Sequence, residues 1–344
     1  GGGAELGAKN RAILYVGRSR HGELGRGCRR GSGVMSPSGL PTIEDVGGRQ
    51  EFATMEDGTR VRFARFRPDN PVARTLMLPG FTEFIEKHLE TIADLLDRRH
   101  EVLCVDWRGQ GLSDRALADR HRGYVPSMEL FLSDLRETLE VTEFASGGTT
   151  PFTVIGHSMG GHLALRAAAE CDALFERVIA VAPMVDILTG HFPRVLSPWL
   201  ARAATVMGMS AWYPPGAGGY DAKAMTFEGN PLTHDGARFQ RTHDLIAREP
   251  RLALGNPTFA WIDAAFTSIN RLKDLATIAQ IQQPVLIVRA GQELIVSNAA
   301  QEWLCRELPN ARLVEIVEAK HEILNETDAV RALFWREADA FLAG

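Results

Sequence analysis

The pentapeptide GHSMG, residues 156–160, places a serine between two glycines, after the apolar run "FTVI" and before a stretch rich in alanine and leucine. A serine on a tight strand-to-helix turn can act as a nucleophile, because the turn exposes its hydroxyl and the helix start stabilises developing negative charge. Glycine at positions 156 and 160 avoids collisions with neighbouring backbone at such a turn. The pattern therefore predicts Ser158 as a nucleophile.

A nucleophilic serine needs a base, and the base needs a carboxylate to orient it. For a serine on this kind of turn, the order along the chain is serine, acid, histidine. His321, in "VEAKHEILNE", follows the last predicted strand, and we expect it to be the base. Two carboxylates follow strand ends: Glu293 in "VLIVRAGQELIVSN", and Asp186 just after "VIAVAPMV". We expect Glu293 to be the acid and keep Asp186 as the alternative.

The charge that develops on an attacked carbonyl oxygen is stabilised by backbone amides. Met159, at the start of the predicted helix, supplies one amide, and the loop after "RTLMLPG" supplies the second. Gly80 lets the chain turn there, which leaves the Phe81 amide as the candidate. No metal or other cofactor is predicted, because HExxH is absent and the cysteines have no CxxC spacing.

Other polar residues near these motifs are expected to be structural. His157 adjoins the serine but is expected to point elsewhere at the turn, and "DWRGQGLSD", which contains Asp106 and Arg108, is expected to be a tight loop after a strand. Four further histidines lie in polar helical or loop settings, where we expect surface residues: His88, His100, His234 and His243.

Composition is that of an ordinary globular protein: 45% hydrophobic, 24% charged, with a formal net charge of -5 over 344 residues. This balance gives no basic field that would attract nucleic acid. No apolar run approaches the roughly 18 residues that a membrane helix needs. The four scattered cysteines favour reduced thiols, so we expect a cytoplasmic location, with a peripheral membrane location as the alternative.

From about residue 50, short apolar runs alternate with longer helical stretches, which is typical of an α/β fold with a mostly parallel sheet. Helices are predicted at 127–144 and 159–171. In the first, apolar residues recur at helical spacing: Met128, Phe131, Leu132, Leu135 and Leu139. Strands are predicted at 60–66, 74–80, 101–107, 152–158, 176–184, 284–290 and 311–317.

The pattern divides the chain into four segments. Residues 1–49 are expected to be a disordered tail and linker, since residues 1–34 are rich in glycine and basic residues and have little apolar periodicity. Residues 50–186 and 281–344 form the two parts of the α/β core. Residues 187–280 lack the alternation and are expected to be an inserted, largely helical cap.

Aromatic residues are frequent in the predicted cap, and two interpretations of them stay open. They could line a pocket for an acyl chain or form a small core of the cap, and core packing explains most of them. They are Phe192, Trp199, Trp212, Tyr213, Phe259 and Trp261.

Four motifs in this order, "LPGFTEFIEKH", "DWRGQGLSD", "GHSMGG" and "KHEILNE", resemble those of α/β-hydrolases of the lysophospholipase and monoacylglycerol lipase-like group. The resemblance covers about residues 50–344. It implies Ser158 as nucleophile, His321 as base, and the Phe81 and Met159 amides as oxyanion donors. Relatives often have His-Gly where this chain has Pro79-Gly80, and usually aspartate where it has glutamate at 293.

The resemblance implies a serine hydrolase of carboxylic esters with a fatty acyl chain, a lysophospholipid or a monoacylglycerol. Alternatives are a general short-chain esterase, another cofactor-free activity such as a haloperoxidase-like or acyl-transfer reaction, and a catalytically silent binding protein. The expected partner is a small-molecule or lipid ester, with no nucleic acid, and a transient contact of the cap with a membrane surface is kept open. Nothing in the sequence assigns an oligomeric state.

Overall fold

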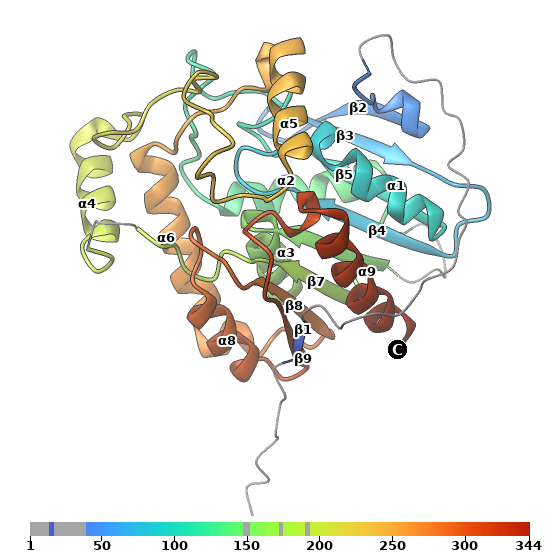
Figure 1. Ribbon diagram of the computed structural model, residues 1–344. Helices are drawn as coiled ribbons and strands as arrows, with labels where there is room; N and C mark the ends of the chain where they lie inside the picture. The colour runs from blue at the N-terminus through green and yellow to red at the C-terminus, as the bar shows by residue number, and fades with distance from the viewer. Residues whose placement is uncertain (1–13, 17–38, 147–151, 172–174, 190–192) are drawn as a thin grey trace, which may run out of the picture.

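A computed structural model of the chain describes residues 14–16, 39–146, 152–171, 175–189 and 193–344. Its strands are β1 (Leu14–Val16), β2 (Gly48–Thr54), β3 (Arg60–Phe66), β4 (Ala73–Leu78), β5 (His100–Val105), β6 (Phe152–His157), β7 (Arg177–Val181), β8 (Val285–Ala290) and β9 (Ala311–Ile316). They form one sheet in the order β1-β9-β8-β7-β6-β4-β5-β3-β2 (Figure 1). β3 pairs antiparallel with β2 and β5, and all other neighbours are parallel, so the predicted α/β fold is confirmed.

All seven predicted strands are present, and most end earlier than predicted because the chain turns into the loops at the carboxyl edge of the sheet. β2 was not predicted. It is an edge strand that pairs only with β3 among the described residues, and five of its seven residues are exposed, so it lacks the apolar pattern that reveals an inner strand. Of the predicted tail and linker, 1–49, the structure describes 14–16, which form β1 and pair with β9, and 39–49. The expectation of disorder was wrong for 39–49, because this part contains the turn Glu44–Val46 and the start of β2, and Ile43 is buried in the core.

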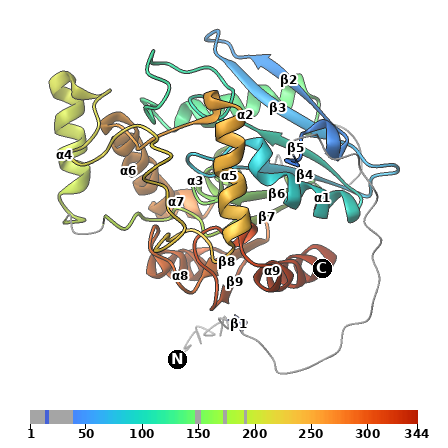
Figure 2. The ribbon, with the colours of Figure 1, turned by 45° about the horizontal axis from the view of Figure 1, so that its top comes forward.

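Helices cover both faces of this sheet (Figures 1 and 2). One face carries α1 (Leu89–Asp97) and α9 (Asp328–Ala343), whose apolar residues share a core with Met77 and Ile155 of the sheet. The opposite face carries α2 (Glu129–Val141), α3 (Met159–Glu170), α6 (Phe259–Lys273), α7 (Leu275–Ile278) and α8 (Asn298–Glu307). Successive strand residues point to opposite faces, so Leu76 and Leu78 belong to this second core.

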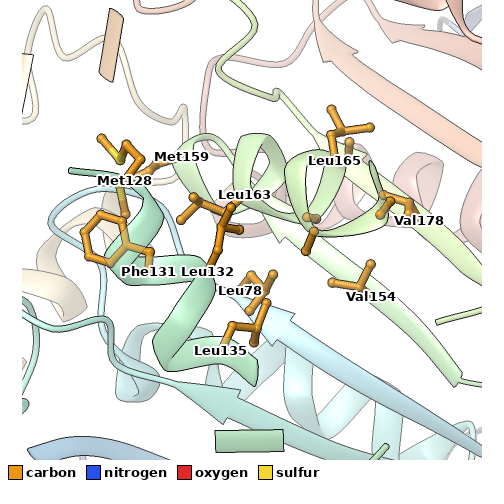
Figure 3. Close-up of a cluster of buried hydrophobic side chains, with 14 of the residues drawn as sticks. Leu78, Met128, Phe131, Leu132, Leu135, Val154, Met159, Leu163, Leu165 and Val178 are labelled. Atoms are coloured by element: carbon orange, nitrogen blue, oxygen red, sulfur yellow. The ribbon is translucent and has the colours of Figure 1, made fainter. Parts of the chain in front are cut away.

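The helix predicted at 127–144 is α2, and its apolar stripe is buried as expected: Met128, Phe131, Leu132, Leu135 and Leu139. Figure 3 shows the first four of these side chains facing Leu163 of α3 and Leu78 of β4. Because α3 begins at the nucleophile position, packing between the two helices and the sheet holds the turn before α3 in place.

The predicted cap segment, 187–280, contains α4 (Ser197–Ala204), a π-helical turn (Thr205–Met209), α5 (Gly236–Arg248), a short 3-10 turn (Pro250–Leu252), α6 and α7. The helix α6 packs on α3 in the main core, whereas α4 lies at the outside of the molecule and contacts α6 (Figures 1 and 2). The remaining short 3-10 turns are Glu44–Val46, Ile85–His88 and Ile323–Asn325.

The cap aromatics do not share one environment. Trp261 is buried, but Trp199 and Trp212 are 74% and 61% exposed, so core packing does not explain these two and that expectation was wrong for them. Trp199 lies on α4, and Trp212 follows the π-helical turn after α4. Phe192 lies outside the described residues. None of the described helices is long and apolar enough to cross a bilayer.

Candidate active site

Ser158 occupies the turn between β6 and α3 with φ 52° and ψ −114°, a backbone conformation that side chains disfavour. The turn is possible because its flanks are glycines. A Cβ atom on Gly156 would lie 2.4 Å from the Gly160 carbonyl oxygen, and one on Gly160 would lie 1.9 Å from the Leu78 carbonyl oxygen. The predicted reason for both glycines is therefore confirmed.

Ser158, His321 and Glu293 are brought together from the ends of three strands. His321 Nε2 lies 3.0 Å from Ser158 Oγ, and His321 Nδ1 lies 2.8 and 2.9 Å from the two Glu293 carboxylate oxygens. His321 is 4% exposed, so water does not compete for these hydrogen bonds. In this arrangement His321 Nδ1–H donates to the carboxylate, which leaves Nε2 free to accept the serine proton.

The carboxylate of Glu293 is itself held by the backbone. Its Oε1 accepts hydrogen bonds from the amides of Ile295 and Val296, at 2.9 and 3.2 Å. Burial opposes ionisation, but the hydrogen bond and charge of His321, together with these amides, lower the pKa of Glu293 below its usual range. The group is therefore ionised at neutral pH and can stabilise a protonated His321.

Asp186, the alternative acid, faces other partners. Lys273 Nζ lies 2.6 Å from Asp186 Oδ2, and Arg194 Nε donates to Asp186 Oδ1 at 2.7 Å. Burial raises the pKa of Asp186, but these two cations outweigh it and lower the pKa. The structure thus places Glu293 against His321 and engages Asp186 in an ion-pair cluster at the base of the cap.

The amides of Phe81 and Met159 have no hydrogen-bond acceptor within the described part of the chain. Met159 is the first residue of α3, so its amide is one of the unpaired donors at a helix start. The loop that carries Phe81 is held through its carbonyl groups: Trp107 Nε1 donates to Pro79 O at 2.8 Å and Gln110 Nε2 donates to Gly80 O at 2.9 Å. These contacts leave both candidate amides available to an oxyanion.

The loop at 106–114 is structural, as expected for "DWRGQGLSD". Asp106 is fully buried and accepts from Arg62 Nε at 2.7 Å and from the amides of Ile85 and Leu112. Arg108 pairs with Asp134 of α2 and with Asp57. Through Trp107 and Gln110, the same loop supports the one that carries Phe81, a function that its sequence did not reveal.

Two of the histidines expected at the surface are buried instead. His88 is 1% exposed, and its Nε2 donates to Glu83. His100 is 7% exposed, and its Nδ1 bonds the Thr75 hydroxyl; these bonds replace those to water. Sequence reasoning also missed Glu83 and Lys87, which lie buried in "FTEFIEKH". The available signal was their position within two residues of Phe84 and Ile85, since a short segment that buries large apolar residues also buries polar residues beside them.

A cavity of about 330 Å³ lies beside Phe81, between the core and the cap. Phe81 and Glu322 line its core side, and Phe239 and Ile246 of α5 line its cap side. Tyr220 and His243, hydrogen-bonded to each other at 2.9 Å, add a polar group to the cap wall. Across the described ranges, no cluster of three or more His, Cys, Asp or Glu residues could hold a metal ion.

The comparisons with known proteins agree with this geometry. A model of the family described as "Serine aminopeptidase, S33" matches residues 69–328. The chain is 30% identical to the Haemophilus influenzae protein named probable lysophospholipase L2, over 80% of this chain and 86% of that protein. It is 28% identical to lysophospholipase L2 of Escherichia coli strain K12, over 82% of this chain and 84% of the relative.

Among solved structures, a soluble variant of monoglyceride lipase from Saccharomyces cerevisiae, in complex with a substrate analogue, is similar to this chain. The TM-score is 0.68 at 19% identity, covering 85% of this chain and 94% of that structure. At this identity the similarity concerns the fold, which both chains share.

Proposed function

The chain belongs to the family described as serine aminopeptidase, S33, and from that premise we propose that it is a serine hydrolase that cleaves the acyl ester bond of a lysophospholipid or a monoacylglycerol. The observation that carries the proposal is the continuous line of hydrogen bonds from Glu293 through His321 to Ser158 Oγ. The names of the relatives support lysophospholipids as the first substrates to test.

The reaction follows from the positions of the atoms. Ser158 Oγ attacks the ester carbonyl carbon while His321 Nε2 takes the hydroxyl proton, and the carbonyl oxygen becomes an oxyanion facing the Phe81 and Met159 amides. As the oxyanion collapses, the alcohol leaves with the proton from His321. Water then attacks the acyl-enzyme, His321 takes its proton, and the fatty acid and free Ser158 are released.

A substrate panel on purified protein tests the proposal. Fatty acid release is measured from a lysophosphatidylcholine, a monoacylglycerol and p-nitrophenyl esters of two to sixteen carbons, with the Ser158→Ala variant as the blank. We expect long acyl chains to react faster than short ones, and a fluorophosphonate probe to label the wild type but not the variant. Preference for the shortest ester would indicate a general esterase, and absence of labelling would indicate a binding protein.

We also propose that α4 and the π-helical turn after it contact the lipid surface from which such a substrate comes. This part of the cap exposes large apolar side chains in one short stretch: Val195, Leu196, Trp199, Leu200, Val206, Met207 and Trp212. Exposed apolar patches of this kind mark interaction sites, and tryptophan favours the boundary between lipid and water. Arg202 of α4 has a 67% exposed side chain, but its guanidinium pairs with Asp263 at 3.1 Å, so the proposal depends on the apolar side chains.

A further inference from the structure

A cluster of buried charged groups lies directly beneath the candidate active site and is not part of the serine–histidine–acid line. Glu83 is 2% exposed, Lys87 6%, His157 4% and Glu322 7%. Lys87 Nζ bridges the two acids, at 3.1 Å from Glu83 Oε1 and 2.6 Å from Glu322 Oε1. Charges this far from water persist only when they are paired, so the arrangement of the whole cluster is strongly constrained.

The ring of His157 lies between two acceptors. Its Nδ1 is 3.0 Å from Glu83 Oε2, and its Nε2 is 3.1 Å from the backbone carbonyl oxygen of His321. A neutral imidazole has one N–H and can donate to only one of them, whereas an imidazolium donates to both. With His157 protonated, the cluster holds two cations, Lys87 and His157, against two anions, Glu83 and Glu322.

The groups that face His157 favour this state. Burial lowers the pKa of His157, but the adjacent Glu83 carboxylate, with a smaller contribution from Glu322, outweighs burial and the opposing charge of Lys87 and raises it. The ring of His321 lies 5.0 Å from that of His157, and His88 reaches the same Glu83 oxygen from the other side at 3.1 Å.

Glu83 also binds the loop that carries the Phe81 amide. Its Oε2 accepts a hydrogen bond from the Gly80 amide, the residue directly before Phe81. The same carboxylate therefore contacts the oxyanion loop through Gly80 and, through His157, the backbone of His321.

Resting on the proposed function, we propose that Glu83 and a protonated His157 are positioning residues, which together fix the oxyanion loop relative to the catalytic base. Neither touches the reacting atoms. Loss of the bond from His157 Nε2 to the His321 carbonyl frees the base to move relative to Ser158, and misplacement by about 1 Å lowers a rate by about 100-fold. Loss of the His157 proton at alkaline pH has the same consequence, because the one remaining N–H stays with the Glu83 carboxylate, the stronger acceptor, and the bond to the His321 carbonyl breaks.

Two variants of His157 separate its two bonds. His157→Gln places an amide donor near the Nε2 position, toward His321, and His157→Asn places one near the Nδ1 position, toward Glu83. We expect kcat on a soluble p-nitrophenyl ester to fall about 10- to 100-fold in His157→Asn and less than about fivefold in His157→Gln, with KM little changed in both. Glu83→Gln should behave like His157→Asn. The wild type should lose kcat at alkaline pH, and both His157 variants should lack that loss.

His162 supplies the matched control. It lies on α3 and is buried like His157, but it faces no carboxylate within the described ranges: its Nε2 lies 2.7 Å from the Ser268 hydroxyl. Burial together with Arg166 lowers the pKa of His162 to about 3. His162→Gln should leave kcat and its pH dependence unchanged. In histidine-labelled protein, ¹⁵N NMR should show an imidazolium for His157 and a neutral ring for His162 at pH 7.5, with the His157 signal assigned from its absence in His157→Gln.

Each outcome decides one claim. If the wild type neither hydrolyses esters nor reacts with a fluorophosphonate, the proposed function fails, and this inference fails with it. If the wild type is active but His157→Asn keeps its kcat and pH profile, or if the NMR spectrum shows a neutral His157, the inference alone is overturned. Should His157→Asn not fold, the wild-type pH profile and the NMR spectrum still decide.

Discussion

Beneath Ser158, the side chains of Glu83 and His157 are 2% and 4% exposed, whereas on the cap Trp199 and Val206 are 74% and 73% exposed. The first region is polar and buried, with its charges paired and most of its polar atoms hydrogen-bonded; the second is apolar and exposed. Buried hydrogen-bond networks specify one arrangement, because any other leaves a polar group unpaired. Exposed apolar residues on a helix impose no such constraint and are free to meet a partner. In this fold, the residues that must keep fixed positions lie in the buried region beneath Ser158, and the residues that are free to contact a surface lie on the cap.

The sharpest test of the buried region is removal of the nucleophile. Ser158→Ala should lower kcat by about 10⁴- to 10⁶-fold, because no other hydroxyl in the described part of the chain bonds His321 Nε2. Circular dichroism and the melting temperature should stay near wild type, since the hydroxyl is not part of the core packing. A variant that keeps a tenth of the wild-type rate would end the assignment of Ser158.

The two candidate acids provide the next test. Glu293→Gln keeps the volume of the side chain but removes the charge that stabilises protonated His321, and kcat should fall by about 10²- to 10⁴-fold. Asp186→Asn, which disturbs the pairs with Lys273 and Arg194, should lower kcat by less than about threefold. Glu293→Asp keeps the charge but shortens the side chain by one methylene, so we expect only partial activity. Reversed effects in the two isosteric variants would make Asp186 the acid.

Glycines in the two regions should respond differently to alanine. In Gly160→Ala the new Cβ would lie 1.9 Å from the Leu78 carbonyl oxygen, and backbone atoms of the sheet can move away only at a high energy cost. We therefore expect the free energy of unfolding to fall by about 4 kcal/mol or more. In Gly208→Ala of the cap nothing lies within 4 Å, and only the positive φ of 83° opposes the change, at about 1–2 kcal/mol. Denaturant unfolding of both variants measures their free energies of unfolding. Equal decreases in the two variants would contradict the prediction that Gly160 is the more constrained position.

The acid dependence of stability should reveal the charge of Glu293. Its pKa is lowered in the folded chain, so its contribution is present above the unfolded pKa of about 4.3 and is lost as pH falls through the lower folded value. The melting temperature of the wild type should exceed that of Glu293→Gln by about 2 °C at pH 7, and the gap should close below pH 4. A gap that is constant from pH 7 to pH 3 would show that the charge contributes nothing.

The smallest effect on chemistry is expected in the cap. Trp199→Ser should change kcat on a soluble short ester by less than about twofold, because Trp199 lies outside the groups that contact Ser158. The fraction of Trp199→Ser that sediments with vesicles of anionic phospholipid should nevertheless be severalfold lower than that of the wild type. Val141→Ser, at a 64% exposed apolar position on α2, is the matched control and should sediment like the wild type. If both variants bind equally to vesicles, the lipid contact does not involve α4.

Much of the fold and part of the candidate site could be predicted from local sequence. The alternation of apolar runs and helical stretches predicted the strands β3 to β9 and the helices α2 and α3, because inner parallel strands must be apolar on both faces. The edge strand β2 was not predicted, because most of its residues face water and it therefore lacks an apolar run. The glycines at 156 and 160 predicted the turn at Ser158. A side chain at either position would collide with backbone a few residues away or on the neighbouring strand, so the need for glycine is a local property.

The sequence by itself determined the strands β3 to β9, the turn at Ser158 and the position of His321, since each depends on local periodicity, sterics or chain order. Only the tertiary structure decided which of two strand-end carboxylates faces His321, because Glu293 and Asp186 follow adjacent parallel strands and differ in where their side chains point. It alone decided that Glu83 and His157, far apart in sequence, share a buried hydrogen bond. Burial and partner choice are properties of packed surfaces, which arise only when distant segments meet.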